Sequence, residues 1–202
     1  MWWDELERLT LKNNSLPPRL FFNNIIRGRE ECVLSGGDPD ALFMDIHDEL
    51  KYSTLAQREL ILSSLRQQTI SGPPGNEINR QMTFEEIRTL SRSPYATMGA
   101  HTINHISLGM QEEDVQQHEL KESKHILEEL TGKPVQYFAY PYGTTSDFSP
   151  LTASIASQTG FKLSFGNYYG FATKNTAQHK IPRILVRNWD TMELKEQINL
   201  HY

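Results

Sequence analysis

Residues Gly99–His105 read Gly-Ala-His-Thr-Ile-Asn-His, and this stretch places two imidazoles four residues apart directly after a short apolar run. Side chains at positions i and i+4 of a helical turn lie on the same face, with Cβ atoms about 5–6 Å apart, so both rings can converge on one ion. Imidazole is a common ligand of zinc and of related transition metals. The spacing therefore marks His101 and His105 as candidate metal ligands.

The sequence around this stretch alternates helical and strand patterns from residue 81 onward. Thr83–Glu86 has the capping-box pattern of a helix start, and this helix is expected to end before Pro94. Strands separated by helices of this length indicate βα units that build a parallel sheet or barrel. The remaining predicted helices cover 111–130, 150–158 and 192–200, and the predicted strands cover 95–99, 135–140, 161–166 and 184–186.

Two candidate site segments directly follow predicted strands. His101 comes just after the strand predicted over 95–99, and the turn Tyr140–Gly143 ends the strand predicted over 135–140. In parallel βα folds, chemistry gathers at the carboxyl ends of the strands. We therefore expect the two segments to form one site.

The first 80 residues have a different character, with helical patterns and little strand signal. Helices are predicted over 2–11, 38–52 and 54–68, followed by a turn-rich connector at Ser71–Gly75. The apolar face of the third helix is expected to comprise Leu55, Leu60, Ile61, Leu62 and Leu65. We expect one domain over 1–202, made of a mainly helical segment over 1–80 and βα units over 81–202.

The composition excludes several classes of function. The formal net charge is -5 and no basic cluster stands out, so nucleic-acid binding is not expected. The single cysteine, Cys32, rules out an internal disulfide and a cysteine-based zinc cage. The apolar runs are too short to cross a bilayer, and the first residues lack the features of a signal peptide. The cellular location stays open.

Five stretches of this chain together resemble the polysaccharide deacetylases, the NodB-homology domain of carbohydrate esterase family four. The resemblance covers about residues 82–190 and implies an α/β fold, a partial or distorted (β/α) barrel of the NodB type, with a helical N-terminal segment. The stretches are Gly99–His105, Leu127–Val135, Phe138–Gly143, Gly160–Phe161 and Pro182–Arg183.

The resemblance implies a metal-dependent hydrolase that removes acetyl groups from N- or O-acetylated polysaccharide. His101 and His105 would be two ligands of a divalent metal, with zinc the best match, and the metal would polarise the acetyl carbonyl and activate water. The backbone N–H of Tyr142 would stabilise the oxyanion. Arg183 would take the place of an arginine that pairs with the family's base, the alternative being an arginine that anchors a loop.

Three further residues are candidates for contact with the glycan. Tyr140 and Pro141 lie in the turn after a predicted strand, and Trp189 lies near the C-terminus. Aromatic faces pack on sugar rings, which favours a substrate-binding role for Tyr140 and Trp189. A half-buried packing role is the alternative for Trp189.

The chain departs from the family pattern in three places. It contains no Thr-Phe-Asp-Asp segment, it has Ala139 where many members have arginine, and His201 lacks the context of the family's Leu-x-His motif. The third metal ligand, the general base and the general acid are therefore unassigned. We expect the family's first strands and their motif to precede residue 1. The alternative function is an inactive remnant or a glycan-binding module.

Overall fold

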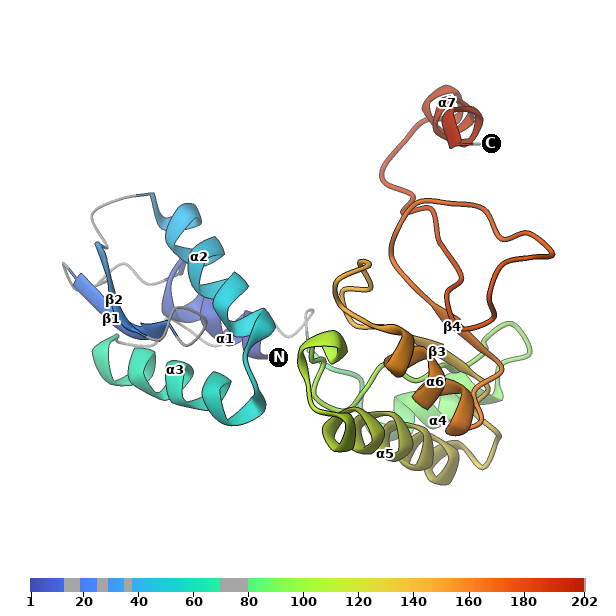
Figure 1. Cartoon of the computed structure of the whole chain (residues 1–202), viewed down its shortest axis with the longest axis horizontal. Helices are drawn as coiled ribbons and strands as arrows, with labels where there is room; N and C mark the ends of the chain where they lie inside the picture. The colour runs from blue at the N-terminus through green and yellow to red at the C-terminus, as the bar shows by residue number, and fades with distance from the viewer. Residues whose placement is uncertain (13–18, 25–28, 35–37, 70–79, 202) are drawn as a thin grey trace. The chain divides into compact units, whose positions relative to one another are not determined.

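A computed structural model describes residues 1–12, 19–24, 29–34, 38–69 and 80–201 of the chain (Figure 1). The chain divides into two compact units, Met1–Gln81 and Met82–Tyr202. This boundary coincides with the change of character predicted near residue 80, and the predicted connector Ser71–Gly75 lies outside the described residues. One deacetylase-like domain over 1–202 remains a prediction.

Unit 1 contains the three predicted helices and a hairpin that the sequence analysis missed. The helices are α1 (Trp2–Leu9), α2 (Pro39–Tyr52) and α3 (Leu55–Gln68). Strands β1 (Arg19–Asn24) and β2 (Arg29–Leu34) pair antiparallel, with Arg19 opposite Leu34. The expectation of little strand structure over 1–80 was therefore wrong, because short apolar runs such as Leu20–Phe22 do not alternate and carry no clear period.

The helices of unit 1 pack around a small apolar core. Ile61 and Leu65 of α3 are 1% exposed or less, as the predicted apolar face requires. Leu55 and Leu60, placed on the same face by the prediction, are instead 40% and 62% exposed. An amphipathic helix buries only one stripe of positions, and these two leucines lie outside it.

Four helices of unit 2 agree closely with the predicted ranges. They are α4 (Phe84–Arg92), α5 (Glu113–Thr131), α6 (Pro150–Gln158) and α7 (Thr191–His201). Thr83 forms the predicted capping box with Glu86 at the start of α4. Gly132 ends α5 with φ of 66°, a left-handed conformation that glycine adopts without the steric penalty of a side chain. Every helix in the described ranges is too short or too polar to span a bilayer.

The sheet of unit 2 is parallel and stays open in the part of the chain that is described. Strands β3 (Tyr137–Ala139) and β4 (Leu163–Phe165) pair in parallel, with Phe138 opposite Ser164. Single bridges extend the sheet on both sides, from Ala100 to Phe138 and from Phe165 to Ile181. This unclosed parallel sheet with its helices confirms the predicted α/β fold and is consistent with a partial or distorted barrel.

Two predicted strands of unit 2 differ from the observed ones. The strand predicted over 95–99 is reduced to the bridge at Ala100, and the strand predicted over 184–186 is wrong because pairing occurs at Ile181 instead. Leu185 and Val186 are 48% and 60% exposed. A run of β-prone residues alone does not fix where a strand pairs, since pairing depends on the neighbouring backbone.

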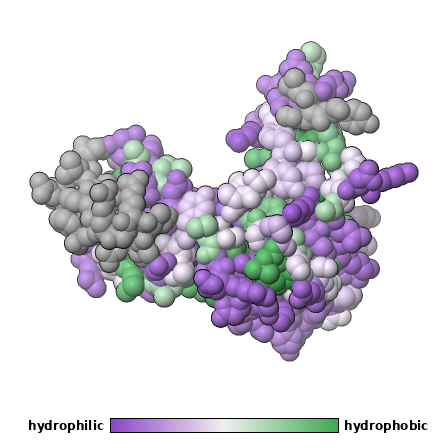
Figure 2. All heavy atoms as spheres, viewed as in Figure 1, coloured by the Kyte–Doolittle hydropathy of each residue, from purple (hydrophilic) through white to green (hydrophobic). Residues whose placement is uncertain are grey.

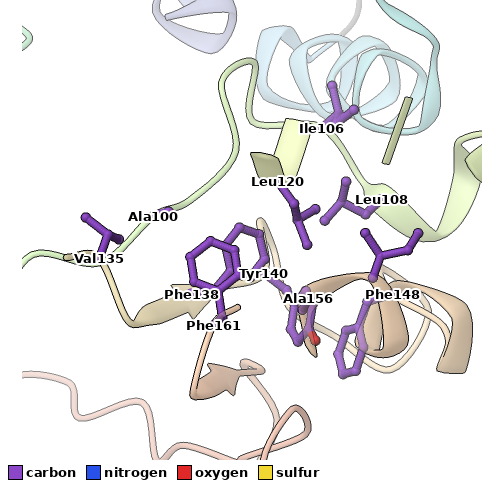
Figure 3. Close-up of a cluster of buried hydrophobic side chains, with 11 residues drawn as sticks. Ala100, Ile106, Leu108, Leu120, Val135, Phe138, Tyr140, Phe148, Ala156 and Phe161 are labelled. Atoms are coloured by element: carbon purple, nitrogen blue, oxygen red, sulfur yellow. The ribbon is translucent and has the colours of Figure 1, made fainter. Parts of the chain in front are cut away.

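A cluster of apolar side chains joins α5 and α6 to the sheet (Figure 3). Leu120 of α5 is fully buried in this cluster, which also includes the rings of Phe138 and Phe161. The outer face of α5 is hydrophilic in Figure 2. The helix therefore packs against the rest of unit 2 through one buried stripe, in which Leu120 is the apolar member.

Replacing Leu120 by alanine is expected to lower the free energy of unfolding by about 2–5 kcal/mol, because it leaves a cavity in a close-packed cluster. Ile126→Ala on the same helix is the matched control, since Ile126 is 43% exposed. Its loss is expected to be under about 1 kcal/mol. Denaturant unfolding followed by circular dichroism measures both, and equal losses would contradict the assigned core.

Candidate active site

His101 is placed by the backbone pairing between residue 100 and β3. The Ala100 N–H donates to the Tyr137 carbonyl at 2.9 Å, and the Ala139 N–H donates to the Ala100 carbonyl at 2.9 Å. Immediately after this bridge, His101 Nδ1 lies 2.7 Å from the Ala139 carbonyl oxygen. A carbonyl oxygen only accepts, so Nδ1 carries the proton and Nε2 of the neutral ring keeps its lone pair. This is the tautomer that binds a metal through Nε2.

His105 reaches His101 through a tight loop rather than the helical turn assumed from the spacing. Thr102 and His105 have φ of 62° and 49°, and the His105 N–H donates to Thr102 Oγ1 at 3.0 Å. The two imidazole centroids are 4.8 Å apart, with ring planes at 78°. The loop therefore brings together the two side chains that the motif pointed to.

Tyr142 joins the histidine pair from the turn that follows β3. Its ring centroid lies 4.8 Å from that of His105, and its hydroxyl donates to the His105 carbonyl at 3.4 Å. Tyr142 has φ of 59°, and the next residue, Gly143, has φ of 72°. The Gly143 N–H donates to the Pro141 carbonyl at 2.6 Å. Three non-glycine residues at positive φ thus gather at one edge of the sheet, as is common at functional sites.

Arg183 anchors a neighbouring loop and also acts electrostatically on His101. Its Nε donates to the Gly166 carbonyl at 2.6 Å, and its backbone N–H donates to the Tyr168 carbonyl at 3.1 Å. Desolvation by the surrounding protein lowers the pKa of His101 below its ordinary value, and the positive charge of Arg183 lowers it further. The hydrogen bond to Ala139 opposes these two effects.

The three predicted glycan contacts lie in different surroundings. Tyr140 is 1% exposed, stacks on Phe148 with centroids 4.1 Å apart, and donates its hydroxyl to the His179 carbonyl at 2.9 Å (Figure 3). Burial raises the pKa of Tyr140 to about 12. Pro141 is also buried, while Trp189 is half-buried just before α7. The observed position of Tyr140 is that of a core residue.

Two buried carboxylates near the site were missed by the sequence analysis. Asp147 is fully buried and accepts from Ser107 Oγ at 3.0 Å and from the Thr144 N–H at 3.0 Å. Glu119 of α5 is also fully buried and accepts from the histidine loop. The one feature of the sequence that could have indicated its burial is its position next to Leu120 on the inward-facing side of α5.

The histidine pair fits a metal as two of its ligands. The tautomer of His101 and the short distance between the rings suit imidazole ligation. Within the described residues, no group of three or more His, Cys, Asp or Glu side chains could hold a metal ion. A third protein ligand, which catalytic zinc sites normally have, is therefore not provided by this part of the chain.

Comparison with known families agrees with this geometry. Residues 74–164 match the family model described as polysaccharide deacetylase. These residues, somewhat less than half of the chain, are similar to polysaccharide deacetylases. The matched range includes His101, His105 and Tyr142 and ends before Arg183 and Trp189. No curated protein matches the chain.

Solved deacetylase structures share the fold of this part of the chain. The Streptococcus pyogenes deacetylase PplD in complex with acetate is 24% identical with a TM-score of 0.53, over 59% of this chain and 52% of that one. The putative polysaccharide deacetylase BA0330 from Bacillus anthracis is 25% identical with a TM-score of 0.51, over 59% and 37%. BC0361, a polysaccharide deacetylase from Bacillus cereus, is 20% identical with a TM-score of 0.51, over 70% and 47%. The chain spans about half of these structures or less.

Gly143→Ala is expected to destabilise unit 2 and distort the Tyr142 turn. A Cβ there would lie 2.7 Å from the Asn167 backbone nitrogen, at a φ of 72° that alanine rarely adopts. Gly132→Ala is the matched control, because its φ is 66° and nothing lies within 4 Å of its Cβ. Thermal unfolding is expected to show a larger loss of stability for Gly143→Ala than for Gly132→Ala. Equal losses would contradict the close approach of residue 143 to the Asn167 backbone.

The lowered pKa of His101 predicts a stability that depends on pH. The unfolded chain takes up a proton at the ordinary histidine pKa of about 6.5, whereas the folded chain resists protonation to lower pH. Stability from this group is present above about pH 6.5 and is lost as the pH falls toward the folded pKa. His101→Gln is expected to lose less stability than the parent between about pH 7.5 and 5.5 in metal-free denaturant unfolding. If the unfolding free energies of the parent and of His101→Gln changed equally with pH, His101 would not be the source of the pH dependence.

Proposed function

We propose that this chain is a metal-dependent hydrolase that removes acetyl groups from N- or O-acetylated polysaccharide. The observation that carries the proposal is the clustering of His101, His105 and Tyr142 at one edge of a parallel sheet, within residues that are similar to polysaccharide deacetylases. The deacetylase PplD is described in complex with acetate, which is the product that such a reaction releases. The substrate class is therefore an acetylated glycan.

His101 and His105 are proposed to hold the metal through imidazole nitrogens. The hydrogen bond from His101 Nδ1 to the Ala139 carbonyl fixes the ring plane and directs Nε2 away from β3. A divalent metal bound there, with zinc the best match to imidazole, would supply Lewis acidity and a water of lowered pKa. The lowered pKa of His101 keeps its ring neutral, which is the form that binds a metal.

Tyr142 and Arg183 are proposed to act on the reacting acetyl group. The backbone N–H of Tyr142, held in a turn with positive φ, would donate to the developing oxyanion. The positive charge of Arg183 reaches His101 and favours negative charge near the site. Pro141 and Trp189 are proposed to border the glycan, while the buried Tyr140 ring packs on Phe148 in the core.

A glycan-binding module without hydrolysis is the second candidate function. It is favoured by one observation, namely that the described residues provide no cluster of three metal-ligating side chains. Such a module would bind an acetylated oligosaccharide without releasing acetate. Acetate release from acetylated chitooligosaccharide, measured with and without added zinc, separates the two functions.

Zinc titration by calorimetry tests the metal site. We expect saturable binding by the parent chain and a loss of at least about tenfold in affinity for His101→Ala and for His105→Ala, since each substitution removes a ligand. His118→Ala is the control, because His118 is exposed on α5. It should bind zinc as the parent does.

Two results would contradict the proposed site. One is zinc binding that survives in both histidine variants, which would place the ion elsewhere. The other is a folded parent chain that binds no zinc. Circular dichroism of each variant establishes that it is folded before the titration is interpreted.

A further inference from the structure

Glu119 is a fully buried carboxylate whose hydrogen bonds end on the histidine loop. Its Oε2 accepts from the backbone N–H groups of Ile103 and Asn104 at 2.8 and 3.0 Å. Its Oε1 accepts from Asn104 Nδ2 at 2.6 Å. The side chain is 0% exposed. A buried carboxylate persists only where donors compensate its lost hydration, and here the three donors all belong to the loop between the two histidines.

The two backbone donors form an anion-binding arrangement in the loop. Consecutive N–H groups that point into one concavity bind negative charge. In this chain the concavity is filled by a carboxylate from α5, a helix whose Leu120 is fixed in the apolar cluster. The position of Glu119 is therefore set by the core, independently of the loop that it holds.

The loop needs such a partner because its backbone is strained. Thr102 and His105 flank the two donating residues, and both have positive φ. Non-glycine residues keep this conformation only when the surrounding structure overdetermines it. The bonds to Glu119 lie between the two strained residues, where they oppose relaxation of the loop.

We infer that Glu119 is the positioning residue of the histidine pair, holding the loop 101–105 in the conformation that presents both imidazoles to one metal ion. The part of this inference that concerns the metal ion rests on the proposed function, whereas the hold of Glu119 on the loop does not. Glu119 does not touch the ion. It acts through the backbone of Ile103 and Asn104, so the histidine spacing depends on a carboxylate 14 residues beyond His105 in the sequence.

Amide hydrogen exchange in the metal-free chain tests the loop directly. Glu119→Gln keeps the shape of the side chain but leaves one accepting oxygen, and its NH₂ group cannot accept from an N–H donor. We expect faster exchange at Ile103 and Asn104 by at least about tenfold. Glu129→Gln is the matched control on the same helix, since that side chain is 70% exposed, and its loop exchange should be unchanged.

Zinc titration then tests the consequence for the metal site. Glu119→Gln is expected to lower zinc affinity by about 10–100-fold, the usual effect of losing a group that orients the ligands. Asn104→Ala removes only the Oε1 contact and should give a smaller loss. Ile155→Ala in α6 is the control for lost stability alone, and in its folded form it should bind zinc as the parent does.

The outcomes separate this inference from the proposed function. Unchanged exchange and unchanged zinc affinity in folded Glu119→Gln would overturn the inference. Absence of zinc binding in the parent chain would overturn the proposed metal site, while the exchange measurement would still decide whether Glu119 orders the loop. If Glu119→Gln does not fold, Glu119→Asp carries both measurements, because its shorter side chain draws the carboxylate away from the Ile103 and Asn104 N–H groups, and parent-like values for both would overturn the inference.

Discussion

The parallel pairing of residue 100 with β3 is the constraint on which the site depends. Two backbone hydrogen bonds of 2.9 Å align Ala100 with Tyr137 and Ala139, so both chain segments leave the sheet at the same edge. The loop of the histidines and the turn of Tyr142 begin there. A shift of one residue in this pairing would send successive side chains to the opposite face and separate the two segments.

Around this pairing, apolar packing and buried charge have different tasks. The cluster that includes Leu120 and Phe138 fixes helices against the sheet, but apolar packing is non-directional and does not set the conformation of a loop. Glu119 and Asp147, each fully buried, add directional hydrogen bonds to the segments 101–105 and 144–147. Packing therefore fixes where the elements lie, and the carboxylates fix the conformation of the loops between them.

The sequence predicted the helices of this chain well because their signals are local. Thr83 and Gly132 are caps whose effect reaches only a turn of helix. The hairpin β1–β2 escaped prediction because its short apolar runs do not alternate, and the pairing of Ile181 escaped it because its partner Phe165 lies on a separate segment of the chain. The histidine pair was recognisable from its motif. Glu119 was not, because two of its three donors are main-chain N–H groups, which no residue type in the sequence marks.

The main chain of one residue, Ala139, forms hydrogen bonds in both the sheet and the candidate site. Its N–H donates to Ala100 and its carbonyl accepts from the His101 ring, so the orienting group of the candidate ligand belongs to the main chain. Main-chain groups persist whichever side chain they carry. The position can therefore vary in residue type without loss of that contact, which is compatible with a shared fold at only 20–25% identity to solved deacetylases.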